Sequence, residues 1–211
     1  MALFLQEQAA GTHWGVWKME ESLDELLALL SDAQRSTYRQ GLARFTSDRR
    51  KQEWLCVRVL LHTLLPDKEK ANIAYTEEGK PFLADHSRFI SISHTKGYAA
   101  VILSTSSPVG IDIEKYGPRV HRVAERFVRP DEEIIPYQDD DTWSLLLHWS
   151  AKETVFKRME NPDADLRKLR VMPFVPQERG TFRLQEMITE RQEVYEIGYR
   201  LLLDAVLTYT I

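Results

Sequence analysis

Two rounds of the same pattern, helices followed by a cluster of strands, constrain how this chain can fold. In the first round a strand at His13–Lys18 leads to helical segments near Leu23–Leu30 and Ala33–Arg44, where apolar residues recur at helical spacing. A longer amphipathic helix runs from about Ser47 to Leu65 and ends at the following proline. Apolar, β-prone stretches between turn residues then predict strands at residues 71–75, 88–92, 98–103 and 109–114.

The second round begins near residues 104–108, where the turn Ser106-Ser107-Pro108 interrupts the strands. Pro118 opens a helix with an apolar stripe, and a further helix runs from Asp141, the expected N-cap, to Met159. Residues 181–211 are typical of a strand meander. Although the two rounds share no convincing internal identity, the pattern predicts an α+β fold of two similar halves, residues 1–105 and 106–211.

Composition excludes several classes of protein. The net charge of −4 argues against a general nucleic-acid binder, so any bound anion needs a local basic cluster. No apolar run approaches the ~20 residues of a membrane helix, and the N-terminus lacks the pattern of a secretory signal. The single cysteine, Cys56, sits among core-like residues, and its solitary occurrence suits a reducing compartment. We therefore expect a cytoplasmic protein that binds neither nucleic acid nor membrane.

The strand at Val109–Glu114 carries two acidic residues, Asp112 and Glu114, at i and i+2. Side chains at this spacing point to the same face, about 6.5–7 Å apart, and can converge on one ion. Carboxylate oxygens suit Mg²⁺, which keeps part of its shell for water and substrate phosphate. The alternative is a solvated acidic strand end.

The helix that spans residues 149–157 places Trp149, Glu153, Phe156 and Lys157 on one face. Glu153 and Lys157 could form a simple i, i+4 ion pair, but the two aromatic neighbours favour a partly buried face where charges need a partner. His148 and Lys152 lie on other faces and are expected to be structural or solvated. Three carboxylates and an amine on two rigid elements suit chemistry on a phosphate or pyrophosphate.

Other polar residues have both a functional and a structural interpretation. His94, with Ser93 beside it, could donate to a phosphate or could be a turn residue bonded to nearby backbone. Lys80 is a turn lysine unless the fold brings it near His94. Arg50 belongs to a basic run that is usually solvated. Three arginines at i, i+3 and i+7 after Pro118 form either a solvated face or a docking surface for an acidic protein; they are Arg119, Arg122 and Arg126.

Taken together, three segments resemble the Sfp-type 4′-phosphopantetheinyl transferases, in the family's order and at plausible separations. They are Gly79–Phe82 leading to Ile92–Thr95, then Val109–Glu114, then Trp149–Lys157. The resemblance extends from about Arg44 to Lys157. It implies a pseudo-dimer of two similar α/β halves with the active site, where coenzyme A binds, in the cleft between them.

The resemblance also implies roles for individual residues. Mg²⁺ is expected to be held against the coenzyme A pyrophosphate by Asp112, Glu114 and Glu153, with Lys157 nearby. On the N-terminal side, the residues that match the surroundings of the 3′-phosphate and adenine are Lys80, Ser93, His94 and, near a family arginine, Arg50. An early lysine pair that some relatives use has no clear counterpart here. The acidic carrier protein docks, in similar enzymes, where Arg119, Arg122 and Arg126 lie.

The resulting hypothesis is transfer of 4′-phosphopantetheine from coenzyme A to a serine of an apo acyl or peptidyl carrier protein, with release of adenosine 3′,5′-bisphosphate. Glu153 is the candidate general base, and Lys157 would stabilise or protonate the leaving phosphate. Such a pseudo-dimer can work as a monomer. Two alternatives are a non-catalytic module that binds coenzyme A or a carrier protein, and a Mg²⁺-dependent pyrophosphohydrolase. The sequence leaves open which carrier protein is the acceptor.

Overall fold

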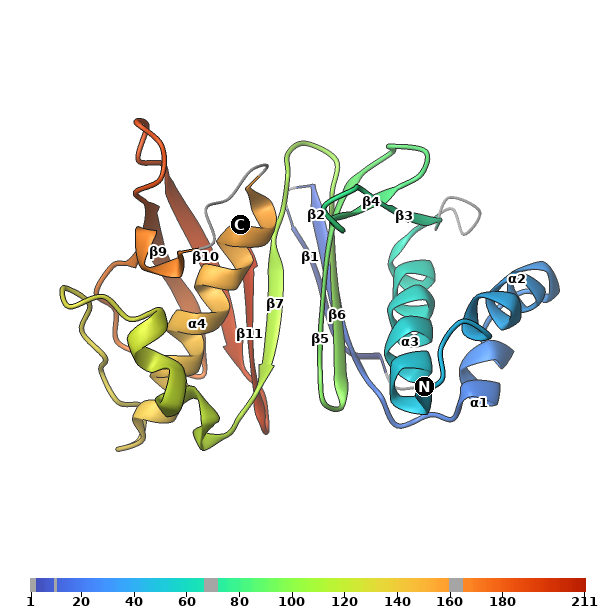
Figure 1. Cartoon of the computed structure of the whole chain (residues 1–211), viewed down its shortest axis with the longest axis horizontal. Coiled ribbons are helices and arrows are strands. Elements are labelled where there is room, and N and C mark those ends of the chain that lie inside the picture. Colours follow the sequence, from blue (N-terminus) through green and yellow to red (C-terminus); the bar gives the residue numbers. More distant parts are fainter. Residues whose placement is uncertain (1–2, 10, 67–71, 160–164) are drawn as a thin grey trace. The chain divides into compact units, whose positions relative to one another are not determined.

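The computed structural model describes residues 3–9, 11–66, 72–159 and 165–211. Contacts divide the chain into two compact units, Met1–Ser107 and Pro108–Ile211. Each unit packs a long helix against an antiparallel sheet (Figure 1), so the fold mixes helices and sheets as the sequence predicts. None of the described helices is both long and apolar enough to span a bilayer.

The N-terminal unit is built on a four-stranded sheet in the order β1-β2-β6-β5. Its strands are β1 (Leu3–Ala9), β2 (Thr12–Lys18), β5 (Phe89–Thr95) and β6 (Tyr98–Ser104), and a separate pair joins β3 (Ile73–Tyr75) to β4 (Pro81–Leu83). The helices are α1 (Leu23–Ala28), α2 (Asp32–Leu42) and α3 (Asp48–Leu64). Serine N-caps begin all three helices, because each side chain accepts a backbone N–H of the first turn; they are Ser22, Ser31 and Ser47.

Helix α3 forms the centre of this unit. It packs against β2 and β6 of the sheet and also contacts α1 and α2, which leaves most of its residues buried. Cys56 lies in this core, and burial raises the pKa of its thiol to about 12, which suits a packing role and not a reactive one.

The C-terminal unit is built on a five-stranded antiparallel sheet in the order β7-β11-β10-β9-β8. Its strands are β7 (Ile111–Lys115), β8 (Leu169–Val171), β9 (Arg179–Glu186), β10 (Val194–Leu201) and β11 (Ala205–Thr210). Helix α4 (Asp141–Arg158) lies on this sheet and contacts β11 and β7 most closely (Figure 1).

Several local expectations need correction. Helix α4 is capped by Asp140 and not by Asp141, because the Asp140 carboxylate accepts the Thr142 N–H at 2.8 Å. The segment that Pro118 opens is a 3₁₀ helix, η2 (Pro118–Arg126), which is narrower than the α-helix that the arginine spacing assumed. Strands β1, β4 and β8 were not anticipated. Of these, β4 and β8 have three residues each and are too short to show alternation.

Gly110 allows α4 to approach β7 closely. A Cβ atom at this position would lie 1.9 Å from the carbonyl oxygen of Thr154 on α4, so no larger residue fits. Buried hydroxyl contacts hold the same surface together: Thr208 Oγ1 on β11 lies 2.8 Å from Ser150 Oγ and 2.7 Å from Thr154 Oγ1. The position of α4 on the sheet is therefore set by a backbone contact and a polar network.

A second buried network surrounds Lys152, which sequence analysis assigned to a structural or solvated role. Its Nζ lies 2.8 Å from Glu132, both side chains are 0% exposed, and Nζ also donates to the Phe127 carbonyl. Glu132 in turn accepts the backbone N–H groups of Arg129 and Val171. Burial lowers the pKa of Lys152, and the charge of Glu132 opposes that shift. Lys152 is therefore structural, and it connects α4 to η2 and β8.

Gly110→Ala should lower the free energy of unfolding by about 1–3 kcal/mol, because the new methyl group pushes α4 away from β7. Urea denaturation measures the loss. Gly117→Ala is the matched control, since nothing lies within 4 Å of its Cβ position and its φ of 170° is extended backbone. Equal stability of the two variants would contradict the close contact.

Lys152→Met should lower the free energy of unfolding by about 3–5 kcal/mol, because it leaves the buried charge of Glu132 without its ammonium. The control is Lys51→Met, which breaks a surface pair with the exposed Asp48 and should change stability by less than about 1 kcal/mol. If thermal and urea unfolding show the two variants to be equally stable, the buried pair does not hold this unit together.

Candidate functional site

Strand β7 places two carboxylates beside α4. Asp112 is 3% exposed and Glu114 is half-buried, while Ile111 and Ile113 between and beside them are fully buried. Asp112 pairs in register with Thr208 and Glu114 with Val206 on β11, so the sheet fixes both positions. Ile111 and Ile113 are buried, as the alternation in the sequence predicts, but neither belongs to the hydrophobic cluster that packs under α4.

Helix α4 supplies the remaining charged groups. Lys157 extends from the helix to β7, where its Nζ lies 2.6 Å from Asp112 Oδ1 and donates to the Ile111 carbonyl at 3.3 Å. Trp149, two turns earlier, donates its indole N–H to Glu114 Oε1 at 2.8 Å. Glu153 lies between them along the helix and is half-buried. The expected face of α4 is therefore turned toward the two carboxylates of β7.

The three carboxylates influence one another electrostatically. The pKa of Glu114 is raised to about 7, first by burial and then by the negative charge of Asp112, with a smaller effect from Glu153. Burial and Asp112 also raise the pKa of Glu153, and Lys157 opposes both shifts. Three acids against one ammonium leave an excess of negative charge in a partly buried place, which a cation would relieve.

These acids are neighbours but are not arranged as a finished metal site. Among the residues that the structure describes, no three His, Cys, Asp or Glu side chains are grouped closely enough to hold a metal ion. Asp112 is turned to Lys157 and Glu114 to Trp149. The donor set, three hard oxygen ligands, fits Mg²⁺ in kind. Their convergence on one ion stays a prediction, because it requires these side chains to turn from their present partners.

A cavity of about 450 Å³ opens beside Glu114. Its walls combine Trp149 of α4 with the apolar Val120 and Val123 of η2, and Arg119 lies among its lining residues. The three arginines expected to dock a partner are all exposed. In a 3₁₀ helix with three residues per turn, Arg119 and Arg122 share a face, whereas Arg126 is turned about a third of a turn away. Only two of the three arginines therefore share a face, whereas the α-helical spacing assumed from the sequence placed all three together.

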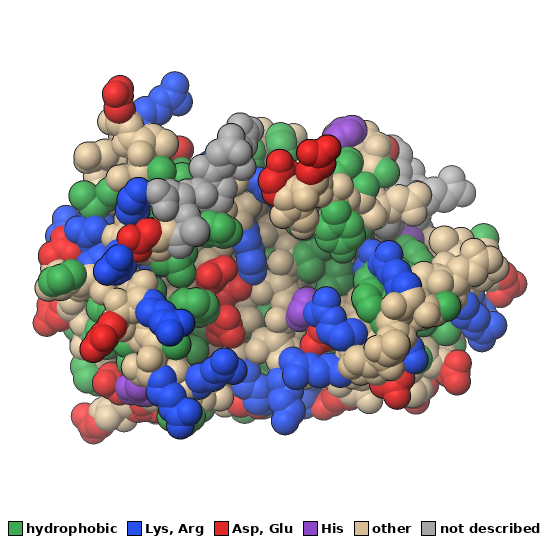
Figure 2. Space-filling view, in the orientation of Figure 1, with side chains coloured by type: hydrophobic (Ala, Val, Ile, Leu, Met, Phe, Trp, Pro, Cys, Tyr) green, Lys and Arg blue, Asp and Glu red, His purple; other side chains and the backbone are tan. Residues whose placement is uncertain are grey.

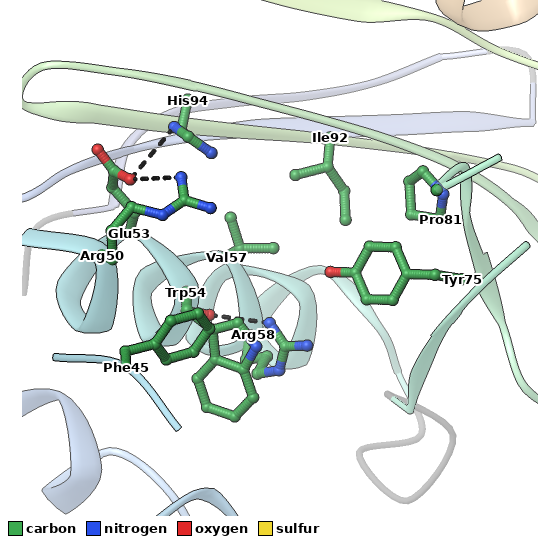
Figure 3. A pocket seen from close by; sticks show the side chains of 11 residues that line it. Phe45, Arg50, Glu53, Trp54, Val57, Arg58, Tyr75, Pro81, Ile92 and His94 are labelled. Atoms are coloured by element: carbon green, nitrogen blue, oxygen red, sulfur yellow. Dashed lines mark hydrogen bonds and ion pairs between the residues drawn. The ribbon is translucent and has the colours of Figure 1, made fainter. Parts of the chain in front are cut away.

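A second cavity, of about 260 Å³, lies in the N-terminal unit. Arg50 and His94 line it, together with Gly79 and Pro81, the two neighbours of Lys80. Ser93 precedes His94 on β5 and is buried. Figure 3 shows Arg50 and His94 at one end of the cavity and Phe45, Trp54, Arg58 and Tyr75 around the rest of it. The structure thus brings Arg50 and His94 together. Ser93 adjoins His94 in sequence, and Lys80 lies between the lining residues Gly79 and Pro81.

Sequence reasoning missed two charged residues that line this cavity, Arg58 and Glu53. The carboxylate of Glu53 pairs with Arg49 and Arg50, and it lies 3.7 Å from His94 Nδ1, with which it forms an ion pair when the imidazole is protonated. The only available signal was the i, i+3 and i, i+4 spacing of Glu53 from the two arginines, which is common on helices. Figure 2 shows that basic side chains gather locally on the surface it displays, as a protein of net charge −4 needs if it binds anions.

Comparison with known proteins relates the chain to one family. The sequence model of the 4′-phosphopantetheinyl transferase superfamily matches residues 108–209, nearly all of the C-terminal unit. The chain is 29% identical to 4′-phosphopantetheinyl transferase ffp of Bacillus subtilis over 148 residues, which cover 66% of this chain and 64% of that protein. It is 32% identical to 4′-phosphopantetheinyl transferase AcpT of Escherichia coli over 124 residues, or 52% of this chain and 58% of AcpT.

A third relative is 4′-phosphopantetheinyl transferase Sfp of Bacillus subtilis, 32% identical over 96 residues that cover 44% of this chain and 42% of Sfp. The chain spans less than two thirds of the length of the relatives it matches. The resemblance to the Sfp-type transferases that the three sequence segments indicated is confirmed. The matched C-terminal segment contains Asp112, Glu114, Glu153 and Lys157.

Proposed function

We propose that this chain is a 4′-phosphopantetheinyl transferase. It moves 4′-phosphopantetheine from coenzyme A to a serine hydroxyl of an apo acyl or peptidyl carrier protein and releases adenosine 3′,5′-bisphosphate. The observation that carries this proposal is the placement, inside the segment that matches the family, of three mutually repelling carboxylates around the ammonium of Lys157.

The proposal assigns one part of coenzyme A to each unit. The cavity with Arg50 and His94 would take the 3′-phosphate and adenine, with Lys80 and Ser93 beside it, and the carboxylates of β7 and α4 would face the pyrophosphate. The two units would form a pseudo-dimer with coenzyme A in the cleft between them. The protein would act as a monomer, since a single chain carries both halves. It would lie in the cytoplasm, a reducing compartment that the single buried Cys56 suits.

The chemistry needs a base, a charge partner and a fixed geometry. The serine oxygen attacks the β-phosphorus, the bond to the departing bisphosphate breaks, and the serine proton passes to Glu153, whose raised pKa brings it nearer to neutral pH. Lys157 stabilises or protonates the leaving phosphate. Mg²⁺, held by Asp112, Glu114 and Glu153, would supply neutralisation of the pyrophosphate charge.

The partner would bind at η2. In similar enzymes the carrier protein that docks is acidic. Arg119 and Arg122 present positive charge on one exposed face of η2, beside the cavity next to Glu114. Such a surface attracts an acidic partner and orients its serine toward the carboxylates.

The direct test is incubation of the chain with coenzyme A, Mg²⁺ and apo carrier proteins from fatty-acid, polyketide and nonribosomal-peptide pathways. Mass spectrometry should show one carrier gaining the mass of the phosphopantetheine group. A folded sample that modifies none of them contradicts the proposal. Release of the bisphosphate nucleotide without a carrier would instead indicate a pyrophosphohydrolase, and binding without turnover would indicate a silent module.

Glu153→Gln should reduce the transfer rate by at least about 100-fold, because the proton acceptor is lost, while coenzyme A still binds. The measurements are kcat from the transfer assay and the dissociation constant of coenzyme A. Glu196→Gln, an exposed acid on β10, is the control and should keep the wild-type rate. If coenzyme A binding disappears together with transfer, Glu153 acts as an essential ligand and not as the base.

The double substitution Arg119→Glu and Arg122→Glu should raise KM for the carrier protein by about tenfold or more, because it reverses the charge of the docking face. KM for coenzyme A should not change. The control is Arg191→Glu, an exposed arginine between β9 and β10. An unchanged KM for the carrier protein, or a salt dependence identical to that of the wild type, would rule out docking at η2.

A further inference from the structure

Glu53 is an acid in a place where an anion-binding site needs positive charge. It lies on α3 with its side chain only 5% exposed, and it lines the cavity of the N-terminal unit. Its Oε1 lies 2.8 Å from Arg49 Nε, and its Oε2 lies 3.1 Å from Arg50 Nη1 and 3.7 Å from His94 Nδ1 (Figure 3 draws the last two). One buried carboxylate therefore joins two arginines of a helix to a histidine of the sheet.

Local helix energetics do not explain this arrangement. Arg49 and Arg50 lie in the first turn of α3, where the positive end of the helix dipole disfavours cations. A base placed N-terminal to its acid is also the less favourable order for a helical ion pair. The two arginines are therefore in an unfavourable place for the helix, and Glu53 offsets part of that cost.

Glu53 also leaves most of the positive charge available. It engages one N–H of each guanidinium, and the side chains of Arg49 and Arg50 remain 65% and 58% exposed. Each guanidinium has five N–H donors in a planar fork, so several remain to meet an oxyanion. Two guanidinium charges against one carboxylate leave these three residues net positive.

We propose that Glu53 is the positioning residue of the phosphate end of the coenzyme A site. Its carboxylate holds Arg50 and His94, which come from different elements, at the edge of one cavity so that both face the 3′-phosphate. Without it, two long arginine side chains at a helix terminus would have to be ordered by the ligand itself, at a cost in side-chain entropy. This inference rests on the proposed function, because it takes coenzyme A as the ligand.

Calorimetry with coenzyme A and with 3′-dephospho-coenzyme A separates positioning from a purely structural role. The wild type should bind coenzyme A more tightly, and Glu53→Gln should reduce that preference by about tenfold, roughly one lost charge-assisted hydrogen bond. A structural role would instead weaken both ligands equally. The control is Asp48→Asn, an exposed acid in the first turn of the same helix, which should keep the wild-type preference.

A double-mutant cycle tests whether Glu53 acts through Arg50. Arg50→Gln alone should reduce the preference, and adding Glu53→Gln should then reduce it by less than Glu53→Gln does in the wild type. Additive effects, or a wild type that binds both ligands equally, overturn the proposal. Both experiments measure binding and do not depend on transfer. If the chain binds coenzyme A but transfers nothing, the transferase function is refuted, and the role of Glu53 in binding can still be judged. Should Glu53→Gln fail to fold, a full preference in Arg50→Gln overturns the proposal by itself.

Discussion

The contact between α4 and the edge of its sheet is the constraint on which the C-terminal unit depends. At Gly110 the backbone of the chain approaches the Thr154 carbonyl more closely than any side chain would permit. The buried hydroxyls of Ser150, Thr154 and Thr208 then fix the helix along β11. Because Glu153 and Lys157 occupy the same two turns as Ser150 and Thr154, their distance from Asp112 follows from this packing and not from their own attraction.

The same packing creates an electrostatic imbalance. Burial and mutual repulsion raise the pKa of Glu114 to about 7 and also raise that of Glu153, while Lys157 is committed to Asp112. A protein gains nothing in stability from such a group of acids. In the proposed function, a divalent cation between these carboxylates and a pyrophosphate would neutralise the excess negative charge. The N-terminal unit has the opposite charge balance, because the single carboxylate of Glu53 pairs with the two guanidinium groups of Arg49 and Arg50.

The sequence predicted those features of the fold and of the candidate site that depend on a single helix or strand. Helical spacing and Pro66 located α3, and the i, i+2 spacing on a strand located Asp112 and Glu114. Contacts between elements were not readable in the same way. The spacing of Glu153 and Lys157 suggested a possible pair within the helix, whereas Lys157 contacts Asp112 across to β7. No sequence pattern indicated that Lys152 and Glu132, twenty residues apart, form a buried ion pair. The role of Glu53 could not be predicted, because an acidic residue three or four positions from two arginines is common on a helix surface.

The most direct measurement is the position of a divalent cation in crystals grown with coenzyme A and Mn²⁺, located by anomalous scattering. The account predicts a single peak at about 2.0–2.3 Å from carboxylate oxygens of Asp112, Glu114 and Glu153, with Asp112 turned away from Lys157. A peak that touches none of these three residues, or their carboxylates still held by Lys157 and Trp149 with the ligand bound, would contradict it.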